Sequence, residues 1–364
     1  MTIREVAELA GVSIGTVSNV LNNPAMVAPA TRARVRAAIE STGFVRSTAA
    51  HQLRGGKSRS VGVVILDVSN PFFTDMVRGA EQALRDDGYV LVLCSTDESP
   101  EREQHYLGLL EEHRVEGVLI TPAERELAHV VALANRGIPT VLLDRSAPAG
   151  ALCSVTVDDV RGGELAATHL LSSGRARIAL VNGPASIRQC ADRRRGARRA
   201  ARRLGLDADK AIVEVVVPAL TDVHGEHAVE RVLGELPGVD AVMCANDLLA
   251  LGLLRGLAAR GVSVPDEMAV VGYDDVAFAA MLSPALTSVR QPKLELGIAG
   301  AELLLEESRD PHHVHREVRF EPELVIRASS LPTVGSAGVD ARRAGRKSVA
   351  DPATRRAQPP RQQR

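Results

Sequence analysis

The sequence is short of several features that mark whole classes of protein. Its four cysteines, Cys94, Cys153, Cys190 and Cys244, lie far apart and show no spacing typical of metal ligands. We therefore expect reduced, mostly buried thiols, and no metal or other cofactor. No apolar run is long enough to span a bilayer, and the N-terminus does not have the composition of a secretory signal. These absences predict a cytoplasmic protein without a membrane partner.

Short motifs that accompany common enzyme chemistries are also missing. The sequence contains no P-loop and no G-x-G-x-x-G after a predicted strand. Two pairs of acids, Asp158-Asp159 and Asp274-Asp275, are adjacent in sequence, so their side chains should diverge instead of facing one another. We therefore expect a protein that is not an enzyme.

Charge is divided unevenly along the chain, although its formal net charge is only −1. The segment 1–60 carries a balance of +5 and the segment 332–364 carries +6, which leaves −12 on the stretch between them. A basic head on an acidic body indicates that the head, and not the body, meets the phosphates of a nucleic acid.

The N-terminal segment 1–22 has the pattern of two short helices joined by a tight turn. Thr2 and Glu5 form a capping box for the first helix, which ends at Gly11, and Ser13 can cap the second. The side chains on the outer face of the second helix are small and mostly polar, and belong to Ile14, Gly15, Thr16, Ser18 and Asn19. This pattern is typical of a helix-turn-helix unit whose second helix enters a major groove, although an ordinary helical hairpin fits it as well.

A third helix is predicted at about 31–41. From Val61 onward the pattern of apolar residues changes. Apolar, β-branched runs alternate with helix-period segments, twice over, as far as Asp275. This alternation predicts two doubly wound parallel sheets with helices on both faces. Ligands of such sheets bind beyond the carboxyl ends of the strands, which here means the cleft between the two halves.

These patterns divide the chain into four parts. We predict an all-α helix-turn-helix head at 1–46, a linker at 47–60, an α/β body at 61–330 and a disordered basic tail at 331–364. Within the body, we assign about 61–158 and 290–318 to an N-terminal subdomain, and about 159–289 and 319–330 to a C-terminal one.

Several motifs, in this order and at this spacing, resemble those of the LacI/GalR (lactose-repressor) family of transcription regulators. The likeness rests on the stretch 2–23, on SNPFF at 69–73, on ANDLLALG at 245–252 and on VGYDD at 271–275. The family implies a hinge helix after the head and a body like the periplasmic sugar-binding proteins. It also implies a homodimer, most often a repressor, on a palindromic operator in double-stranded DNA, controlled by a small sugar-like effector.

The resemblance assigns DNA contacts residue by residue. Base contacts come from Ile14, Gly15 and Asn19, and phosphate contacts come from the hydroxyls of Ser13, Thr16 and Ser18. In the linker, Leu53 matches the hinge leucine that wedges between base steps in the minor groove, and Ala50 lies one turn before it. Taken without the head, Leu53 would be an ordinary linker residue.

The resemblance also assigns effector contacts in the cleft. Arg193, Asn246 and Asp274 match the ligand-binding arginine, amide and carboxylate, and Phe73 matches a ring that lies against the ligand. Asp67 and Asp144 follow predicted strands, where cleft residues belong, but solvated strand ends or helix caps fit them equally well. Phe72 and Phe73 are the only rings near the expected cleft, which leaves little for a pyranose to stack on.

Two departures from the family pattern have consequences. Asn19 stands where many relatives have arginine, so the operator half-site need not share their preferred bases. Ala28 stands where a capping serine is usual, which should weaken the third helix by about 1 kcal/mol.

Two other functions compete with this interpretation, an enzyme built on the α/β body and a solute-binding protein of a transporter, and the missing catalytic motifs count against the enzyme. A solute-binding protein of a transporter would fit the body alone, but not the basic head. The seven arginines of 191–203 predict a solvated helix face, with a second nucleic-acid contact as the alternative.

Overall fold

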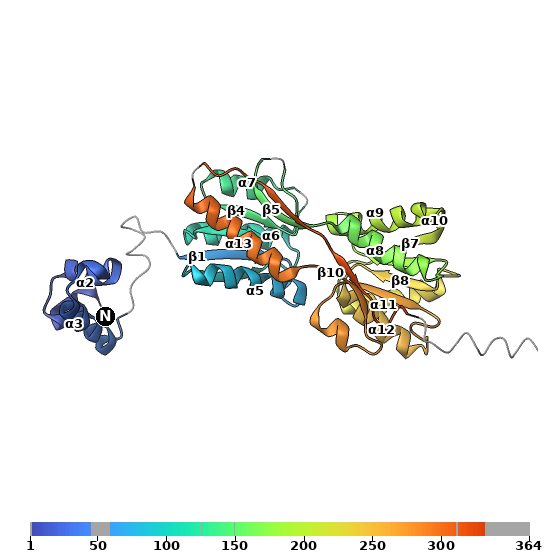
Figure 1. Ribbon diagram of the computed structural model, residues 1–364, viewed down its shortest axis with the longest axis horizontal. Helices are drawn as coiled ribbons and strands as arrows, with labels where there is room; N and C mark the ends of the chain where they lie inside the picture. The colour runs from blue at the N-terminus through green and yellow to red at the C-terminus, as the bar shows by residue number, and fades with distance from the viewer. Residues whose placement is uncertain (1, 45–58, 125, 149, 311, 332–364) are drawn as a thin grey trace, which may run out of the picture.

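The computed structural model describes residues 2–44, 59–124, 126–148, 150–310 and 312–331. The predictions for Ala50, Leu53, nearly all of the linker and the segment 332–364 lie outside these residues. The described residues form a helical head and two α/β lobes (Figure 1). None of the helices in these ranges combines the length and the apolarity that crossing a bilayer requires.

The head consists of α1 (Ile3–Ala10), α2 (Ile14–Asn22), the short 3-10 turn η1 (Pro24–Met26) and α3 (Pro29–Thr42). The expected capping box is present, because Thr2 accepts a hydrogen bond from the backbone of Glu5 and donates its own N–H to the Glu5 carboxylate at 2.7 Å. Gly11, at φ +62°, ends α1 in the left-handed conformation. The small core of the head is made of Val6, Ala7, Ala10, Val17, Val20, Val35 and Ala38.

The third helix begins two residues earlier than the sequence predicts, because Pro29 occupies its first turn, where a proline costs no hydrogen bond. Ala28 is the N-cap of α3 and makes no side-chain hydrogen bond there. We expect Ala28→Ser to stabilise α3 by about 1 kcal/mol, since a serine oxygen can accept one of the unpaired N–H groups of the first turn. Slower hydrogen exchange of the α3 amides would show this, and unchanged exchange would contradict it.

The N-terminal lobe is built on a six-stranded, wholly parallel sheet of order β11-β5-β4-β3-β1-β2. Its strands are β1 (Ser60–Ile65), β2 (Val90–Ser95), β3 (Gly117–Ile120), β4 (Thr140–Leu143), β5 (Cys153–Val157) and β11 (Glu317–Phe320). One face packs against α5 (Pro71–Asp86) and α13 (Lys293–Arg309), and the other against α6 (Pro100–Glu112) and α7 (Ala128–Asn135).

The C-terminal lobe repeats this plan with the strand order β12-β10-β9-β8-β6-β7, in which only β12 is antiparallel. Its strands are β6 (Ile178–Asn182), β7 (Ile212–Val216), β8 (Ala241–Cys244), β9 (Ala269–Asp274), β10 (Thr287–Arg290) and β12 (Glu323–Val325). One face packs against α11 (Asp222–Gly234) and α12 (Asp247–Ala259), and the other against α8 (Asp159–Ser172) and α9 (Arg188–Arg203). Short helices α10 (Ala208–Ala211) and η2 (Ala277–Met281) complete this lobe.

The chain passes between the lobes three times, at the connections β5–α8, β10–α13 and β11–β12 (Figure 1). Each connection is short, because α8 begins two residues after β5 ends and β12 begins three residues after β11 ends. The carboxyl ends of β4 and β9 both lead to the region between the lobes, which is where an α/β sheet binds its ligands.

Within each lobe, paired helices cross at glycines in backbone contact. In α8 and α9, a Cβ atom added to Gly163 or Gly196 would lie 2.1 or 2.0 Å from a carbonyl oxygen of the opposite helix. No side chain can be added there without moving the helices apart. The same close crossing joins α5 to α13 and α11 to α12, at Gly79, Gly297, Gly225 and Gly252.

Candidate nucleic-acid interface and ligand cleft

The outer face of α2 is open to solvent, while Val17 and Val20 fix the helix to the head. Ser13 caps it by accepting a hydrogen bond from the Thr16 N–H at 3.1 Å, and the two hydroxyls lie 2.9 Å apart. The exposed or half-buried residues on this face are the six that the sequence predicts, Ser13, Ile14, Gly15, Thr16, Ser18 and Asn19.

This face has the chemistry of a surface for DNA. Ile14 is 41% exposed although it is apolar, and Asn19 is exposed further along the helix. The first turn of α2 carries no acidic residue, so its free N–H groups are available to a phosphate. Ser18 is engaged locally, since the Asn22 amide lies 3.1 Å from its hydroxyl oxygen and donates to it.

One cavity between the lobes brings together all six residues predicted for the effector. Asp67, Phe73 and Asp144 come from the N-terminal lobe, and Arg193, Asn246 and Asp274 from the C-terminal lobe. The cavity has a volume of about 60 Å³, room for only a few water molecules. Phe72, which the sequence placed near the cleft without assigning it a contact, also lines the cavity. Sequence reasoning did not assign the other lining residues, Leu66, Asn70, Glu98, Ile187, Gln189, Leu220 and Gln291.

Asp144 follows β4 with φ +54° and is almost completely buried. Its Oδ2 accepts a hydrogen bond from the Gln189 amide at 2.8 Å, whereas its Oδ1 has no hydrogen-bond partner among the described residues. Burial, aided by the charge of Asp159, raises the pKa of Asp144 to about 8. The group is therefore mostly protonated at neutral pH and can donate as well as accept.

Asp274 is the corresponding acid of the other lobe, at the end of β9 with φ +104°. It accepts a hydrogen bond from the Gln291 amide at 2.7 Å, and burial raises its pKa to about 6 although Arg193 opposes this. Its neighbour Asp275 turns away, as the sequence predicts, and pairs with Arg290 and Arg327 at 2.7 Å each.

Arg193 lines the cavity but is already held by the protein. Its Nε donates to Asp159 Oδ1 at 2.8 Å, and its guanidinium lies 3.6 Å from the centre of the Tyr273 ring. The Tyr273 hydroxyl donates to the same carboxylate oxygen at 2.9 Å. All three side chains are buried, so Arg193 is a structural member of the C-terminal lobe as well as a cavity residue.

The two remaining polar residues of the predicted six, Asn246 and Asp67, also make hydrogen bonds within their own lobes. Asn246 caps α12, because its Oδ1 accepts from the Leu249 N–H at 2.9 Å. Asp67 accepts from the backbone N–H of Ser69 at 2.8 Å, in the turn after β1. Asp67 therefore caps a turn and lines the cavity at the same time.

A larger hollow of about 780 Å³ lies beside the cavity, between α9 and the loop after β4. Arg145 lines this hollow and not the smaller cavity, together with exposed arginines of α9. Along α9, arginines pair with acids, as in Arg194–Glu214 at 2.8 Å and Arg198–Asp209 at 2.9 Å. This pairing favours a solvated helix face over a second nucleic-acid contact.

Asp144 should make the stability of the protein depend on pH. Its pKa is about 8 in the folded chain and about 3.9 in an unfolded one, so the folded state retains a proton between these values. The stabilisation of the folded state by the Asp144 proton is fully present below about pH 4 and is lost as the pH rises towards about 8.

We expect the free energy of unfolding of Asp144→Asn to fall less over this pH range than that of the wild type. Denaturant unfolding at several pH values measures this. Asp67→Asn is the matched control, and equal slopes for Asp144→Asn and wild type would contradict the prediction.

Comparisons with known proteins agree with this geometry. Residues 2–47 match the family described as "Bacterial regulatory proteins, lacI family", and residues 58–323 match "Periplasmic binding proteins and sugar binding domain of LacI family". The HTH-type transcriptional repressor PurR of Aliivibrio fischeri (strain MJ11) is 33% identical, over 91% of this chain and 98% of its own.

Solved structures show the same relationship. The transcriptional regulator CelR in complex with cellobiose is 32% identical, with a TM-score of 0.68 over 90% of this chain and 99% of its own. The lac repressor dimer bound to operator and the anti-inducer ONPF is 26% identical, with a TM-score of 0.80 over 91% of this chain and 99% of its own. These matches confirm the predicted fold class, a helix-turn-helix head with a two-lobed α/β body. The chain therefore belongs to the LacI family and is a DNA-binding transcription regulator with an effector-binding body.

Proposed function

We propose that this protein is a repressor, without enzyme activity, that binds a palindromic operator as a homodimer. A sugar or related metabolite in the cavity between the lobes controls its affinity for DNA. The observation that carries the proposal is the convergence of six polar and aromatic residues from both lobes on one cavity. The related structures bound to cellobiose, to ribose, and to operator with an anti-inducer support it.

On the DNA side, the exposed face of α2 would enter the major groove. Ile14, Gly15 and Asn19 would meet base edges, and the hydroxyls of Ser13, Thr16 and Ser18 would meet phosphates. Ala50 and Leu53, which the resemblance places in a hinge helix, would lie in the minor groove between the two half-sites.

On the effector side, the cavity offers donors and acceptors suited to hydroxyl groups. Asp144, protonated at neutral pH, can donate to a ligand oxygen, and Asp274 can accept from a ligand hydroxyl. Phe72 and Phe73 pack edge to face at 5.1 Å between ring centres and supply an apolar wall. The cavity as it stands has room for only a few water molecules, so we infer that the lobes part to admit a sugar.

The effector would act on DNA through this movement of the lobes. Opening or closing the cleft rotates the lobes about the three connections between them and so shifts the paired linkers of a dimer. Ligand can bias this equilibrium only through its different affinities for the two arrangements. A thousandfold change in operator affinity would need about 4 kcal/mol of coupling.

The test is a thermal-shift screen of sugars and metabolites, followed by operator titrations with each compound that raises the melting temperature. We expect such a compound to change operator affinity in the wild type, and Asp274→Asn to weaken its binding at least tenfold. Arg195→Ala, on the exposed face of α9, is the control and should respond like the wild type. A stabilising compound that leaves operator affinity unchanged would contradict the proposal.

Base readout and phosphate contact can be separated by two substitutions in α2. Asn19→Arg should change the preferred base at one position per half-site by about 1–3 kcal/mol, because a guanidinium can make a bidentate contact to guanine. Thr16→Ala should weaken all operator sequences alike. Binding to a library of half-site variants measures both effects. An equal, sequence-independent loss in the two variants would show that the roles are wrongly assigned.

A further inference from the structure

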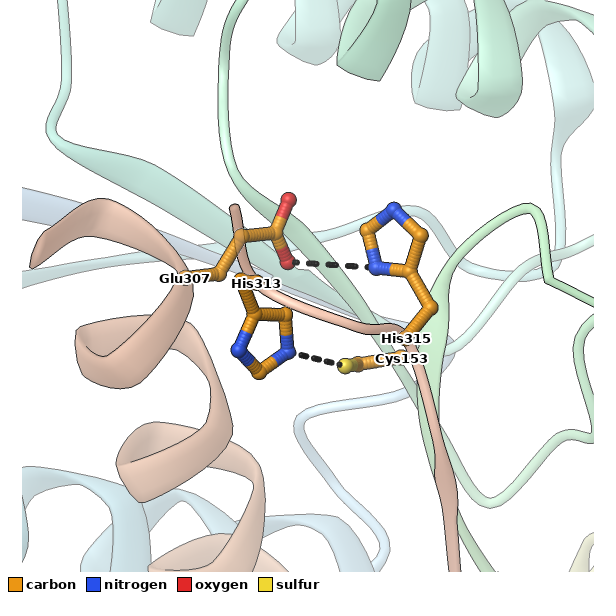
Figure 2. A group of neighbouring side chains, drawn as sticks. All are labelled: Cys153, Glu307, His313 and His315. Carbon is orange, nitrogen blue, oxygen red and sulfur yellow. Dashed lines mark hydrogen bonds and ion pairs between the residues drawn. The ribbon is translucent and has the colours of Figure 1, made fainter. Parts of the chain in front are cut away.

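Four side chains with metal-binding atoms lie together in the N-terminal lobe, outside the cavity already described (Figure 2). Cys153 begins β5, Glu307 lies near the end of α13, and His313 and His315 lie between α13 and β11. Their ligand atoms all lie within 4.8 Å of one another. Cys153 Sγ is 3.0 Å from His313 Nε2, and Glu307 Oε2 is 3.9 Å from His315 Nδ1.

This cluster lies at the opposite end of the strands from the effector cavity. Cys153 is the first residue of β5, and the sheet is wholly parallel, so the cluster is at the amino ends of the strands. The cavity acids follow the carboxyl ends, as Asp144 does after β4. Ser60, the first residue of β1, also lies at an amino end, so the cluster is on the side of the lobe at which the body begins.

The polar atoms of the cluster are poorly satisfied by the protein. Glu307 Oε2 and His315 Nδ1 are both buried, and neither makes a hydrogen bond with the described residues. Cys153 is completely buried. A bound cation would give Glu307 Oε2 and His315 Nδ1 a partner.

The donor set fits one class of ion. A thiolate, two imidazoles and a carboxylate are the nitrogen, sulfur and oxygen ligands that Zn²⁺ takes in tetrahedral sites. Zinc–ligand bonds of about 2.0–2.3 Å place the ligand atoms roughly 3.3–3.8 Å apart. Two of the separations within the cluster, 3.0 and 3.9 Å, lie just below and just above this range, and all of the ligand atoms lie within 4.8 Å of one another.

We propose that Cys153, Glu307, His313 and His315 bind one divalent transition-metal ion of the zinc class. Binding replaces the thiol proton of Cys153, which is released to solvent, and leaves both histidines neutral. The ion joins β5, α13 and the segment before β11. β5, α13 and β11 are the elements of this lobe that lead into the connections with the other lobe, and the ion would lie at their ends away from those connections.

The test uses the full-length protein, freed of metal with a chelator and titrated with Co²⁺ and then Zn²⁺. We expect one Co²⁺ per chain, with a thiolate-to-cobalt charge-transfer band and the strong visible absorption of tetrahedral cobalt. Zn²⁺ should displace the Co²⁺, abolish both signals and raise the melting temperature. Cys153→Ser should lose the charge-transfer band, and His315→Gln should lower Co²⁺ affinity at least tenfold.

Two matched variants control for adventitious binding. His312→Asn removes an exposed histidine next to His313, and Cys94→Ser removes a half-buried thiol on another strand. Both should bind Co²⁺ as the wild type does. The half-buried His315 tests the site even if Cys153→Ser fails to fold. The proposal is overturned if the wild type binds no cobalt, or if folded His315→Gln binds it with wild-type affinity and spectrum.

Discussion

Replacing Arg193 by alanine should lower the free energy of unfolding of the C-terminal lobe by about 3–5 kcal/mol, because it leaves a buried carboxylate without its partner. Asp159 is buried beside Arg193, and the Arg193 guanidinium packs on Tyr273 at 3.6 Å. Urea unfolding followed by circular dichroism measures the loss. Arg195→Ala removes an arginine from the same helix whose side chain is 65% exposed, and should cost less than about 1 kcal/mol.

A second variant separates the buried pair from the packing of the arginine stem. Asp159→Asn combined with Arg193→Met removes both charges and keeps most of the volume, so it should recover a large part of the stability lost in Arg193→Ala. Equal instability in the single and double variants would show that the ion pair is not the cause. The resemblance alone assigns Arg193 only a contact with the ligand. Because Arg193 also contacts Asp159 and Tyr273, we expect Arg193→Ala to impair folding more than it impairs ligand binding.

Leu53→Ala should reduce operator affinity at least a hundredfold, which corresponds to about 2.7 kcal/mol, while effector affinity in the cavity stays unchanged. Under the proposed function, the Leu53 side chain would act as an apolar wedge that holds a base step unstacked, and the resulting bend would lay the DNA against the protein. Fluorescence anisotropy with operator DNA, and calorimetry with an effector from the screen, measure the two affinities.

The neighbouring substitution Gln52→Ala is the control for Leu53→Ala, and should change operator affinity less than threefold. Leu53 lies outside the described residues, so this experiment tests the resemblance directly. A Leu53→Ala protein that binds operator at wild-type strength would rule out a hinge leucine in the minor groove.

The place of the cavity could be predicted from sequence, because the carboxyl ends of parallel strands must meet on one side of a sheet. Asp144 was placed there because it follows a predicted apolar strand, whereas Asp274 was assigned by its match to the family motif VGYDD. Asp159 and Tyr273 were missed as partners of Arg193, although both lie in motifs already noticed. Both are far from Arg193 in sequence, and only the packing of α8, α9 and β9 brings them together.

The end of the body was harder to predict than its beginning. Regular alternation of strands and helices stops after β9, because the next strand, β10, leads to a helix of the other lobe. The parallel neighbours β5 and β11 come from distant parts of the chain, with Val155 opposite Val318. Such a pairing cannot be predicted from a local sequence pattern. The metal-binding cluster depends on that pairing, since Cys153 and His315 meet only when β11 lies beside β5.

The glycine crossings within the lobes decide which mutations could alter regulation. Helices that touch backbone to backbone, as at Gly163 and Gly196, cannot slide or separate without losing their packing, so each lobe moves as a solid body. We therefore expect relative movement of the lobes at the three short connections between them. Under the proposed function, substitutions in these connections would change how readily the protein switches, and substitutions in the cavity would change which effector it binds.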